Sequence, residues 1–539
     1  MPAPNNQVQI QEMPLKIVGG THYGRYDKIS DEATWNMIIS DTALVPYAGY
    51  KNVLDISDID VGRGLYVSYR SNLMYIVIGF DLYSINSSLQ LSAPLGALYT
   101  NTGDVYMSEN NGGEIIITDG QYVYIWNYET STFWTSNPVS TNHFSFPFDS
   151  PGYVSFQNGR FIVASQGTTN WVLSAFNNGG SRGGTPWPVT ANFVGSLQTK
   201  PDYIQAAVPV PGGGNNLLVF GRNVAELWQD VGAATFPYQR NSTLNSDFGC
   251  ISPASIASLN DVIVWIAVNE TTGPMLMTYE RSQINQITTD GIDFKLGNLK
   301  FPQIVTGFLY QQDGHLLYQF TFKRDNLSFA YDFNTKEFFC ISDPELNFHI
   351  ARQVVYFGTT YYFVSLTDGS LYQFDTIFPY ADKGNGNLVP IPRIRIMPPL
   401  RIPSQRYFII NNLAFTLEQG QPNIVTDVVV YDTTGTFITT EGGFLITTED
   451  SVQITTENDN SSTALASYQD SDAIVYLAIS RDGGSTFGNF LPQSMNPTGK
   501  RKSRLNYQRL GIANDATFQI RCVGLIRFVL FDGVVVLYQ

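Results

Sequence analysis

The 539-residue sequence predicts an all-β fold, with an N-terminal β-propeller followed by a C-terminal β-sandwich. Composition gives the first two observations. Aromatic residues make up 14% of the chain, and charged residues also make up only 14%, against roughly 25% in average globular proteins. Aromatic and β-branched side chains fit a pleated, half-buried surface. The third observation is a series of hairpin signals, in which Asn-Gly or Asp-Gly separates two alternating apolar runs.

These hairpin signals recur in units of about four strands, which is typical of propeller blades spaced by ~40–50 residues. Four of the signals are Asp119-Gly120, Asn158-Gly159, Asp313-Gly314 and Asp368-Gly369. We expect seven blades, with six or eight as alternatives. No Trp-Asp or kelch motif marks the units, so a set of stacked sandwiches also stays open. The expected units are about 62–92, 104–137, 152–190, 202–245, 251–290, 301–343 and 350–378.

The chain divides at a proline-rich segment, residues 380–405. Its prolines remove ladder donors and disfavour a central strand, so we expect an extended, fairly stiff linker. Before it, residues 1–55 should form an N-terminal arm with the first strands, and residues 56–379 the propeller. After it, alternating runs within 406–539 predict a β-sandwich of six to eight strands. Helical patterns are short, as at residues 30–38.

The net charge of −15 argues against binding nucleic acid through its phosphates, which requires clustered Lys and Arg. The three cysteines, Cys250, Cys340 and Cys522, are far apart, so we expect buried free thiols instead of a disulfide framework. The N-terminus lacks the basic and apolar regions of a secretory signal. The longest apolar stretch is short and carries Arg527 and Asp532, so no membrane span is expected. We expect a soluble protein made in a reducing cytoplasm.

Motifs of catalysis are missing from the sequence. There is no His-Glu-x-x-His, no Gly-x-Ser-x-Gly elbow and no Walker loop, and the four histidines are widely spaced. The Gly-rich stretches 177–187 and 211–216 lack a strand–loop–helix context, so we interpret them as blade connections and not as phosphate-binding loops. The sequence therefore predicts no enzyme, no cofactor and no metal.

One local motif predicts a structural turn. The stretch SRDGGSTF resembles the Asp-box of sialidases and other propellers, in which Asp and Ser side chains close a hairpin against backbone amides. The motif is remote from catalysis in those proteins. Its residues here are Ser480, Asp482, Gly484, Thr486 and Phe487.

Two basic clusters stand out in the acidic chain. They are either solvated loops and strand ends or a docking patch for an acidic protein, where charge complementarity would set the orientation. Nucleic-acid binding is a weaker alternative, because few aromatic residues interleave the basic ones. The candidate docking residues are Lys500, Arg501, Lys502, Arg504, Arg509, Arg393 and Arg395, with Arg401 and Arg406 beside the last two.

The phrase Ile-Thr-Thr-Glu occurs three times with a spacing of eight residues, within a segment at 433–467. Because eight is even, Ile438, Ile446 and Ile454 keep the same side in any repeated strand arrangement. We expect a small β extension that either packs on its own domain or contacts a neighbouring subunit or fibre. Its glutamates lack the dense Asp/Asn ladder of calcium loops.

The order of several segments resembles the packaged-DNA stabilisation proteins of short-tailed bacteriophages, which form the tail hub or nozzle. Each piece is a strand pattern and not an invariant motif, and the repeat at 433–467 departs from the family pattern. The segments that carry the resemblance are 26–53, 63–85, 158–176, 217–240, 248–267 and 476–524.

The resemblance implies a non-enzymatic virion component assembled in the bacterial cytoplasm. It implies a six-membered ring below the portal and adaptor, which lines the DNA exit channel, retains packaged DNA, and anchors tail fibres or tailspikes and the tail needle or plug. DNA would pass without specific binding, since lining carboxylates repel phosphate. A carbohydrate-binding or carbohydrate-hydrolysing propeller of a phage tail fibre is the alternative.

Overall fold

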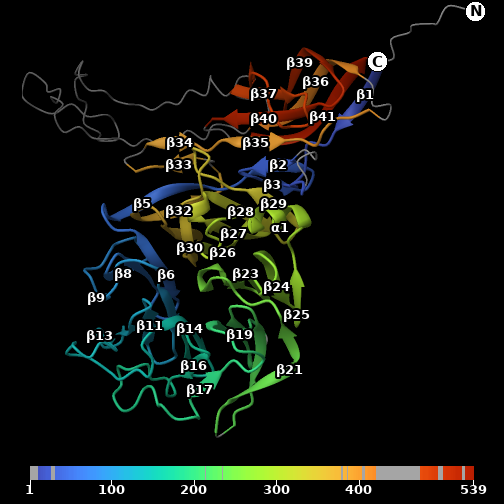
Figure 1. Ribbon diagram of the computed structural model, residues 1–539. Helices are drawn as coiled ribbons and strands as arrows, with labels where there is room; N and C mark the ends of the chain where they lie inside the picture. Colours follow the sequence, from blue (N-terminus) through green and yellow to red (C-terminus); the bar gives the residue numbers. More distant parts are fainter. Residues whose placement is uncertain are drawn as a thin grey trace, which may run out of the picture.

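Seven antiparallel units of four strands occupy the part of the chain from β5 (Gly49–Ser57) to β32 (Gly369–Asp375), and they extend through the middle and lower part of Figure 1. Five of them are separate four-stranded sheets, one is part of a nine-stranded sheet, and one is part of a six-stranded sheet. Sheets built from consecutive strands are the units expected of propeller blades. We number them as blades 1 to 7 in chain order. The computed structural model describes residues 10–25, 31–212, 214–233, 235–377, 380–384, 387–402, 407–419, 474–495, 502–524 and 528–538.

Blades 1 to 5 each consist of four consecutive strands in simple up-and-down order. Blades 1 and 2 contain β6 (Gly62–Ser68), β7 (Leu73–Ile78), β8 (Asp81–Ile85) and β9 (Gly96–Ala97), then β10 (Tyr106–Glu109), β11 (Glu114–Thr118), β12 (Val123–Asn127) and β13 (Thr132–Thr135). Blade 3 contains β14 (Pro151–Gln157), β15 (Arg160–Ser165), β16 (Asn170–Leu173) and β17 (Val194–Ser196). Blades 4 and 5 contain β18 (Ile204–Pro209), β19 (Asn216–Gly221), β20 (Ala225–Asp230) and β21 (Tyr238–Ser246), then β22 (Ala257–Leu259), β23 (Val262–Ala267), β24 (Met275–Glu280) and β25 (Gln283–Gln286).

Blade 7 is completed by a strand from the beginning of the chain. Blade 6 contains β26 (Val305–Gln312), β27 (His315–Phe322), β28 (Leu327–Asp332) and β29 (Glu337–Cys340). Blade 7 contains β30 (Ala351–Phe357), β31 (Thr360–Ser365) and β32 (Gly369–Asp375), and its fourth strand is β5 (Gly49–Ser57), which pairs antiparallel with β32. The two ends of the propeller segment are therefore joined by backbone hydrogen bonds.

The apolar cores show that the ring is closed. Each of seven separate clusters of buried side chains lies between two consecutive blades. The decisive cluster joins the last blade to the first, because Val364 and Leu371 of blade 7 pack with Leu65 and Ile76 of blade 1. The predicted all-β propeller fold is confirmed, and seven blades is the number that the sequence favoured.

Two of the four hairpin signals form two-residue turns with left-handed backbone. Asn158 and Gly159 have φ of 50° and 80° between β14 and β15, and Asp313 and Gly314 have φ of 49° and 85° between β26 and β27. Asp119 and Gly120 lie in a longer connection between β11 and β12. Gly369 begins β32 instead of forming a turn with Asp368.

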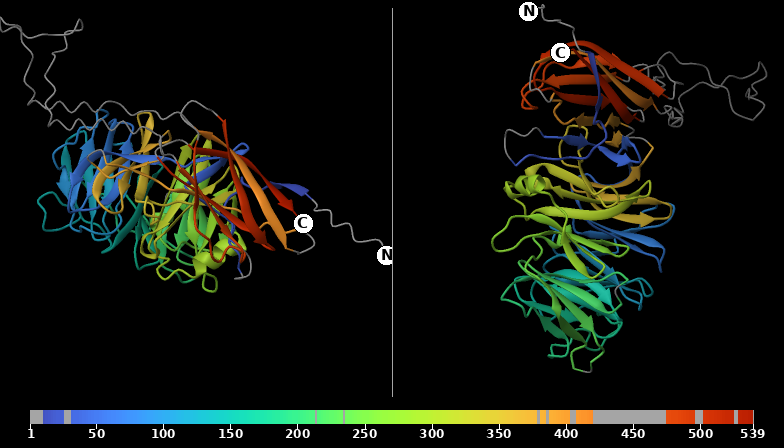
Figure 2. Two further views of the ribbon diagram at one scale, coloured as in Figure 1. Left: turned by 90° about the horizontal axis from the view of Figure 1, so that it is seen from above. Right: turned by 90° about the vertical axis from the view of Figure 1, so that its right-hand side faces the viewer.

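Two facing sheets follow the propeller and share one core. The outer one contains β36 (Phe408–Gln419), β39 (Lys502–Ala513) and β41 (Phe528–Tyr538), together with β1 (Ile10–Leu15), β3 (Met37–Ser40) and β4 (Ala43–Pro46) from the N-terminus. The facing one contains β35 (Arg393–Ile396), β37 (Ile474–Ser480), β38 (Leu491–Ser494) and β40 (Thr517–Val523). Figure 2 shows these strands at one end of an elongated molecule.

The segment expected to be an extended, fairly stiff linker contains paired strands, so the expectation that its prolines prevent a central strand is wrong. β33 (Tyr380–Asp382) pairs with β34 (Leu388–Pro390) and with β5. β35 lies inside a nine-stranded sheet, between β40 and β2 (Ala33–Trp35), and β2 pairs in turn with β29 of blade 6. The prolines lie just outside β35, so its four residues keep their ladder donors.

The short helical pattern at 30–38 is not realised in its described part, 31–38, because β2 and β3 occupy most of these residues. Pairing with distant strands outweighs weak local propensity here. The helices of the described ranges are α1 (Asp290–Gly297) and the 3₁₀ turns η1 (Pro253–Ser255) and η2 (Lys323–Asp325). Within those ranges, none is long and apolar enough to cross a membrane.

Candidate functional site

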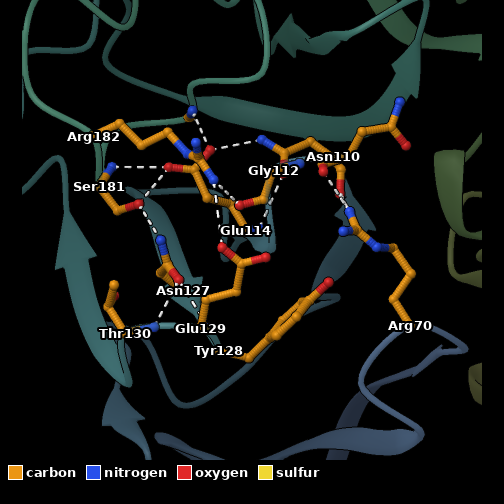
Figure 3. Close-up of polar contacts among 12 residues, drawn as sticks. Arg70, Asn110, Gly112, Glu114, Asn127, Tyr128, Glu129, Thr130, Ser181 and Arg182 are labelled. Atoms are coloured by element: carbon orange, nitrogen blue, oxygen red, sulfur yellow. Dashed lines mark hydrogen bonds and ion pairs between the residues drawn. The ribbon is translucent and has the colours of Figure 1, made fainter.

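The Gly-rich stretch 177–187 is held by a carboxylate of the same chain. Glu114, at the start of β11, is fully buried, and its Oε2 accepts hydrogen bonds from Gly179 N at 2.7 Å and Asn110 Nδ2 at 2.6 Å. Its Oε1 accepts from Ser181 N at 3.1 Å and from the Ser181 hydroxyl. Backbone amides that could have faced a phosphate therefore face Glu114 (Figure 3).

Further contacts in Figure 3 extend this network across three blades. Asn127 of β12 donates from Nδ2 to the Ser181 hydroxyl at 2.8 Å. Arg182 donates to Gly112 O and forms an ion pair with Glu129 at 3.7 Å. Arg70, which follows β6, donates to Asn111 O. The network joins blades 1, 2 and 3 and is structural, in agreement with the interpretation of this stretch as a blade connection.

Arg393 and Arg395 are buried, so the prediction that they form a docking surface is wrong. Both lie on β35, inside the nine-stranded sheet. Arg395 donates to Ile17 O at 2.6 Å and to Gly20 O at 3.0 Å, and it pairs with the carboxylate of Glu32. Burial lowers the pKa of Arg393 to about 10 and also lowers that of Arg395, which Glu32 partly offsets. Arg395 therefore fastens the N-terminal segment to the C-terminal sheet.

The second basic cluster is different, since its described arginines reach solvent. Arg504 and Arg509 are exposed on β39, where Lys502 is the first residue. Lys500 and Arg501 lie outside the described residues, as does Arg406. Arg401 is half-exposed and pairs with Asp515 at 2.6 Å. Of the candidate docking residues, Arg504 and Arg509 therefore remain available to a partner.

The Asp-box-like stretch forms a closed turn directly after β37. The Ser480 hydroxyl accepts from Gly484 N at 2.8 Å, and Asp482 accepts from Thr486 N at 3.0 Å and from its hydroxyl at 2.6 Å. Gly483 and Gly484 have φ of 75° and 96°. Hydrogen bonds from Ser480 and Thr486 lower the pKa of Asp482. Phe487, the last residue of the motif, is partly buried.

The predicted β extension, with Ile438, Ile446 and Ile454 and the whole of 433–467, lies outside the described residues.

The titratable side chains of the core lie in apolar surroundings. Cys250, Cys340 and Cys522 are buried free thiols, as the sequence predicts. Burial raises the pKa of Cys250 to about 12 and that of Cys340 to about 11. His349 is surrounded by aromatic rings, and burial lowers its pKa to about 3. Within the described ranges, no three His, Cys, Asp or Glu side chains gather as metal ligands would.

A cleft of about 330 Å³ lies between blades 1 and 2. Its walls include Tyr99, Tyr124, Phe133 and Asn137. Aromatic rings and an amide are suited to sugar binding, but no carboxylate lines this cleft. Glycoside hydrolysis in most families requires two carboxyl groups flanking the bond, so the cleft lacks the groups for that reaction.

Comparison with known families identifies the propeller. The model of a family described as bacteriophage P22 Gp10, beta-propeller, matches residues 32–377. The chain belongs to this family of phage stabilisation proteins. The match runs from β2 to the end of blade 7, and it confirms the resemblance seen in the order of segments. A search of curated proteins finds no match.

Solved structures similar to this phage protein include three chains of low identity, and this chain covers less than half of the length of the first. The extracellular domain of the one component system BT4673 from B. thetaiotaomicron is 13% identical, with a TM-score of 0.40 over 61% of this chain and 40% of that chain. The computationally designed Ika8 protein is 10% identical, with a TM-score of 0.36, and the match covers 67% of this chain and 99% of that chain. The WD40 propeller of Doa1 is 11% identical, with a TM-score of 0.35, and the match covers 60% of this chain and 96% of that chain.

Sequence reasoning missed Glu114 as the residue that anchors a blade connection. Its partners Gly179 and Ser181 lie 65 and 67 residues away, and no local pattern marks the pairing. Sequence reasoning also missed an exposed apolar surface in the C-terminal sheet, which the pattern of residues in its strands could have indicated. Ile409 and Ile512 occupy exposed positions of alternating strands, where polar residues are the usual choice.

Proposed function

We propose that this protein is the ring-forming tail hub, or nozzle, of a short-tailed bacteriophage. In this role it lies below the portal and adaptor, lines the DNA exit channel, retains packaged DNA, and anchors tail fibres or tailspikes and the tail plug. The observation that carries the proposal is the family match over residues 32–377, which includes all strands of blades 1 to 7.

The architecture supports a rigid wall. Seven packed interfaces close the propeller, and β5 joins its two ends by hydrogen bonds. β2 and β35 then connect blade 6 to the C-terminal strands in one nine-stranded sheet. A force on the C-terminal sheet would reach the propeller through paired strands and not through a flexible linker. Such continuity is suited to a component that retains DNA under pressure.

The charge of the chain supports the passage of DNA. A net charge of −15 repels phosphate and lowers nonspecific binding, which a DNA channel requires. We propose a homo-oligomer of six copies, which binds the portal–adaptor ring on one side and carries fibres or tailspikes and the needle on its other surfaces. Its location is the virion tail, after assembly in the host bacterial cytoplasm.

The test is assembly with the portal–adaptor complex. The purified full chain is mixed with that complex, and the product is measured by light scattering and imaged by electron microscopy. We expect a closed ring of this chain attached to the adaptor. The matched control is the portal ring without adaptor, which should capture less protein. A chain that stays monomeric and never joins the complex would contradict the proposal.

A further inference from the structure

A row of large apolar residues crosses four strands of the outer C-terminal sheet. Ile10 of β1 is paired with Tyr538 of β41, Tyr538 with Ile409 of β36, and Ile409 with Ile512 of β39. Residues directly opposite one another on paired strands point to the same face of a sheet. The four side chains therefore form one continuous row on that face. Figure 1 shows the four strands together at the end of the molecule opposite blades 2 to 4.

This row is exposed to solvent. The exposed fractions are 66% for Ile10, 44% for Ile409 and 58% for Ile512, and Tyr407, which precedes β36, is exposed by 72%. Two further rows on the same face add Val536 and Val534 of β41, which are partly exposed. We call this outer face of β1, β41, β36 and β39 the apolar sheet face.

The other side of the same sheet already has its apolar partner. Leu413, Phe415, Val535 and Leu537 point into the core that the two facing sheets share. A sheet with one buried face usually alternates with polar residues on the solvated face. Contiguous exposed apolar patches of this kind mark interaction surfaces. The apolar sheet face therefore fits a second protein surface.

The acidic and basic residues of this face lie on different strands. Glu12 lies on β1, and Arg504 lies on β39 at the opposite edge, with Arg509 on the same strand. Asp532 lies between them on β41, and Glu418 of β36 is paired with Lys502 of β39. The carboxylates of the face are therefore offset by the basic residues of β39, in a chain of net charge −15. The face is basic along the edge strand β39 and acidic on the other three strands, so two copies can bring opposite charges together.

We propose that the apolar sheet face is a contact surface between copies of this chain. The inference rests on the proposed function, because a ring requires contacts among its subunits. A second copy is favoured over a foreign partner for two reasons. Two acidic molecules meet with least repulsion through a neutral apolar surface. Opposite charges at the two edges make the face complementary to itself, and charge pairs of this kind set the register of an interface.

The first experiment removes the apolar row in the full chain. The variant Ile409→Asp/Ile512→Asp should self-associate about 100-fold more weakly than the wild type, because buried apolar anchors dominate interface energies. Light scattering over a concentration series measures this change. Ile59→Asp is the matched control, since Ile59 is 92% exposed on the propeller, outside this face. Ile409→Thr/Ile512→Thr keeps strand propensity and replaces the Asp pair if that pair does not fold.

The second experiment exchanges charges between the edges. Glu12→Lys and Arg504→Glu should each weaken self-association, and the double variant should restore it, which only a contact between copies predicts. The proposal is overturned if the apolar variants self-associate as the wild type does, or if the double exchange does not restore association. It is also overturned if the wild type stays monomeric at every concentration and also when bound to the adaptor. If the adaptor still binds such a chain, the tail-hub role survives. If copies associate through this face but never bind the adaptor, the tail-hub role fails alone.

Discussion

The propeller and the C-terminal pair of sheets are built from the chain in different ways. Blades 1 to 6 each take four consecutive strands, so their pairings are local. The C-terminal sheets instead combine strands from the first 46 residues with strands after residue 392. Loop-closure entropy makes such distant pairings costly to form. We infer that the C-terminal region depends on a few long-range contacts, whereas the propeller depends on many equivalent interfaces.

The joint between the two regions is polar and buried. Asn36, between β2 and β3, donates from Nδ2 to Ser342 Oγ and to Pro392 O, each at 2.8 Å. Beside it, Thr34 accepts from Arg395 Nη1 at 3.0 Å. A buried polar network is stabilising when every member has partners, and it is costly when one is removed. This joint is therefore the most sensitive place to test the difference between the regions.

Arg395→Met should have the largest effect. It leaves the buried carboxylate of Glu32 with only the exposed Lys16, 3.4 Å away, as its cation. Breaking a buried pair in this way costs about 3–5 kcal/mol of unfolding free energy. Chemical denaturation measures the loss. Hydrogen exchange should show increased exchange in β1, β35 and β40 before the blades change.

The matched control is the double variant Glu32→Gln/Arg395→Met. It removes both charges, so it should lose less stability than Arg395→Met alone. Equal stability of Arg395→Met and the wild type, or uniform exchange over both regions, would show that this joint does not control the C-terminal sheets.

Glu114→Gln tests the corresponding polar network inside the propeller, and we expect a smaller effect. Both oxygens of Glu114 accept hydrogen bonds, from Asn110 and Gly179 and from Ser181. In the variant an NH₂ group replaces one of these oxygens and faces N–H donors. An unsatisfied buried group costs about 1–3 kcal/mol of unfolding free energy. Hydrogen exchange should increase in residues 177–183 and remain unchanged in the C-terminal strands. Melting temperature gives the overall loss.

Glu129→Gln is the control for Glu114→Gln, because Glu129 is half-exposed and contacts the same loop through Arg182. Surface ion pairs contribute about 0–1 kcal/mol, so this variant should be close to the wild type. Equal losses for the two variants would contradict the assignment of Glu114 as the anchor of the loop.

Sequence patterns located the features that depend on nearby residues. The hairpin of Asn158 and Gly159 and the turn from Ser480 to Thr486 are each made by a few consecutive residues, so their chemistry is visible in the sequence. The β5 strand of blade 7 and the carboxylate of Glu114 act through partners far along the chain. No local pattern encodes those partners, and they became visible only with the fold.

The arginines illustrate the same limit within one residue type. Arg395 and Arg504 both lie in strands and both follow basic neighbours in the sequence, yet one is buried and the other exposed. Proline content suggested a linker around Arg395, and a linker would have left it in solvent. The flanking prolines limit the length of β35 but do not prevent the strand. The proline content therefore predicted the ends of β35 correctly and failed to predict the strand between them.

Acid should weaken the propeller more than the C-terminal sheets, and His349 is the reason. This residue lies in the core between blades 6 and 7, where its ring packs against Tyr47, Tyr50, Phe363 and Phe374. Burial lowers its folded-state pKa from 6.5 to about 3. Below pH 6.5 the unfolded chain binds a proton at His349 that the folded chain does not. The contribution of neutral His349 to the free energy of unfolding is therefore fully present above pH 6.5, and it is lost as the pH falls toward 3.

The expected loss at pH 5.5 is about 1 kcal/mol, since one pH unit below the unfolded pKa corresponds to at most about 1.4 kcal/mol. Denaturant titrations at pH 7.5 and pH 5.5 measure it, and His349→Phe should lose that much less between the two, because its ring cannot be protonated. The variant also loses the hydrogen bond that Ala351 N donates to His349 Nδ1. For this reason the change in stability between the two pH values is measured for each protein separately, and these two changes are then compared. Hydrogen exchange at pH values corrected for intrinsic rates should place the change in blades 6 and 7. Parallel pH dependence of the two proteins would mean that other groups, and not His349, make the propeller sensitive to acid.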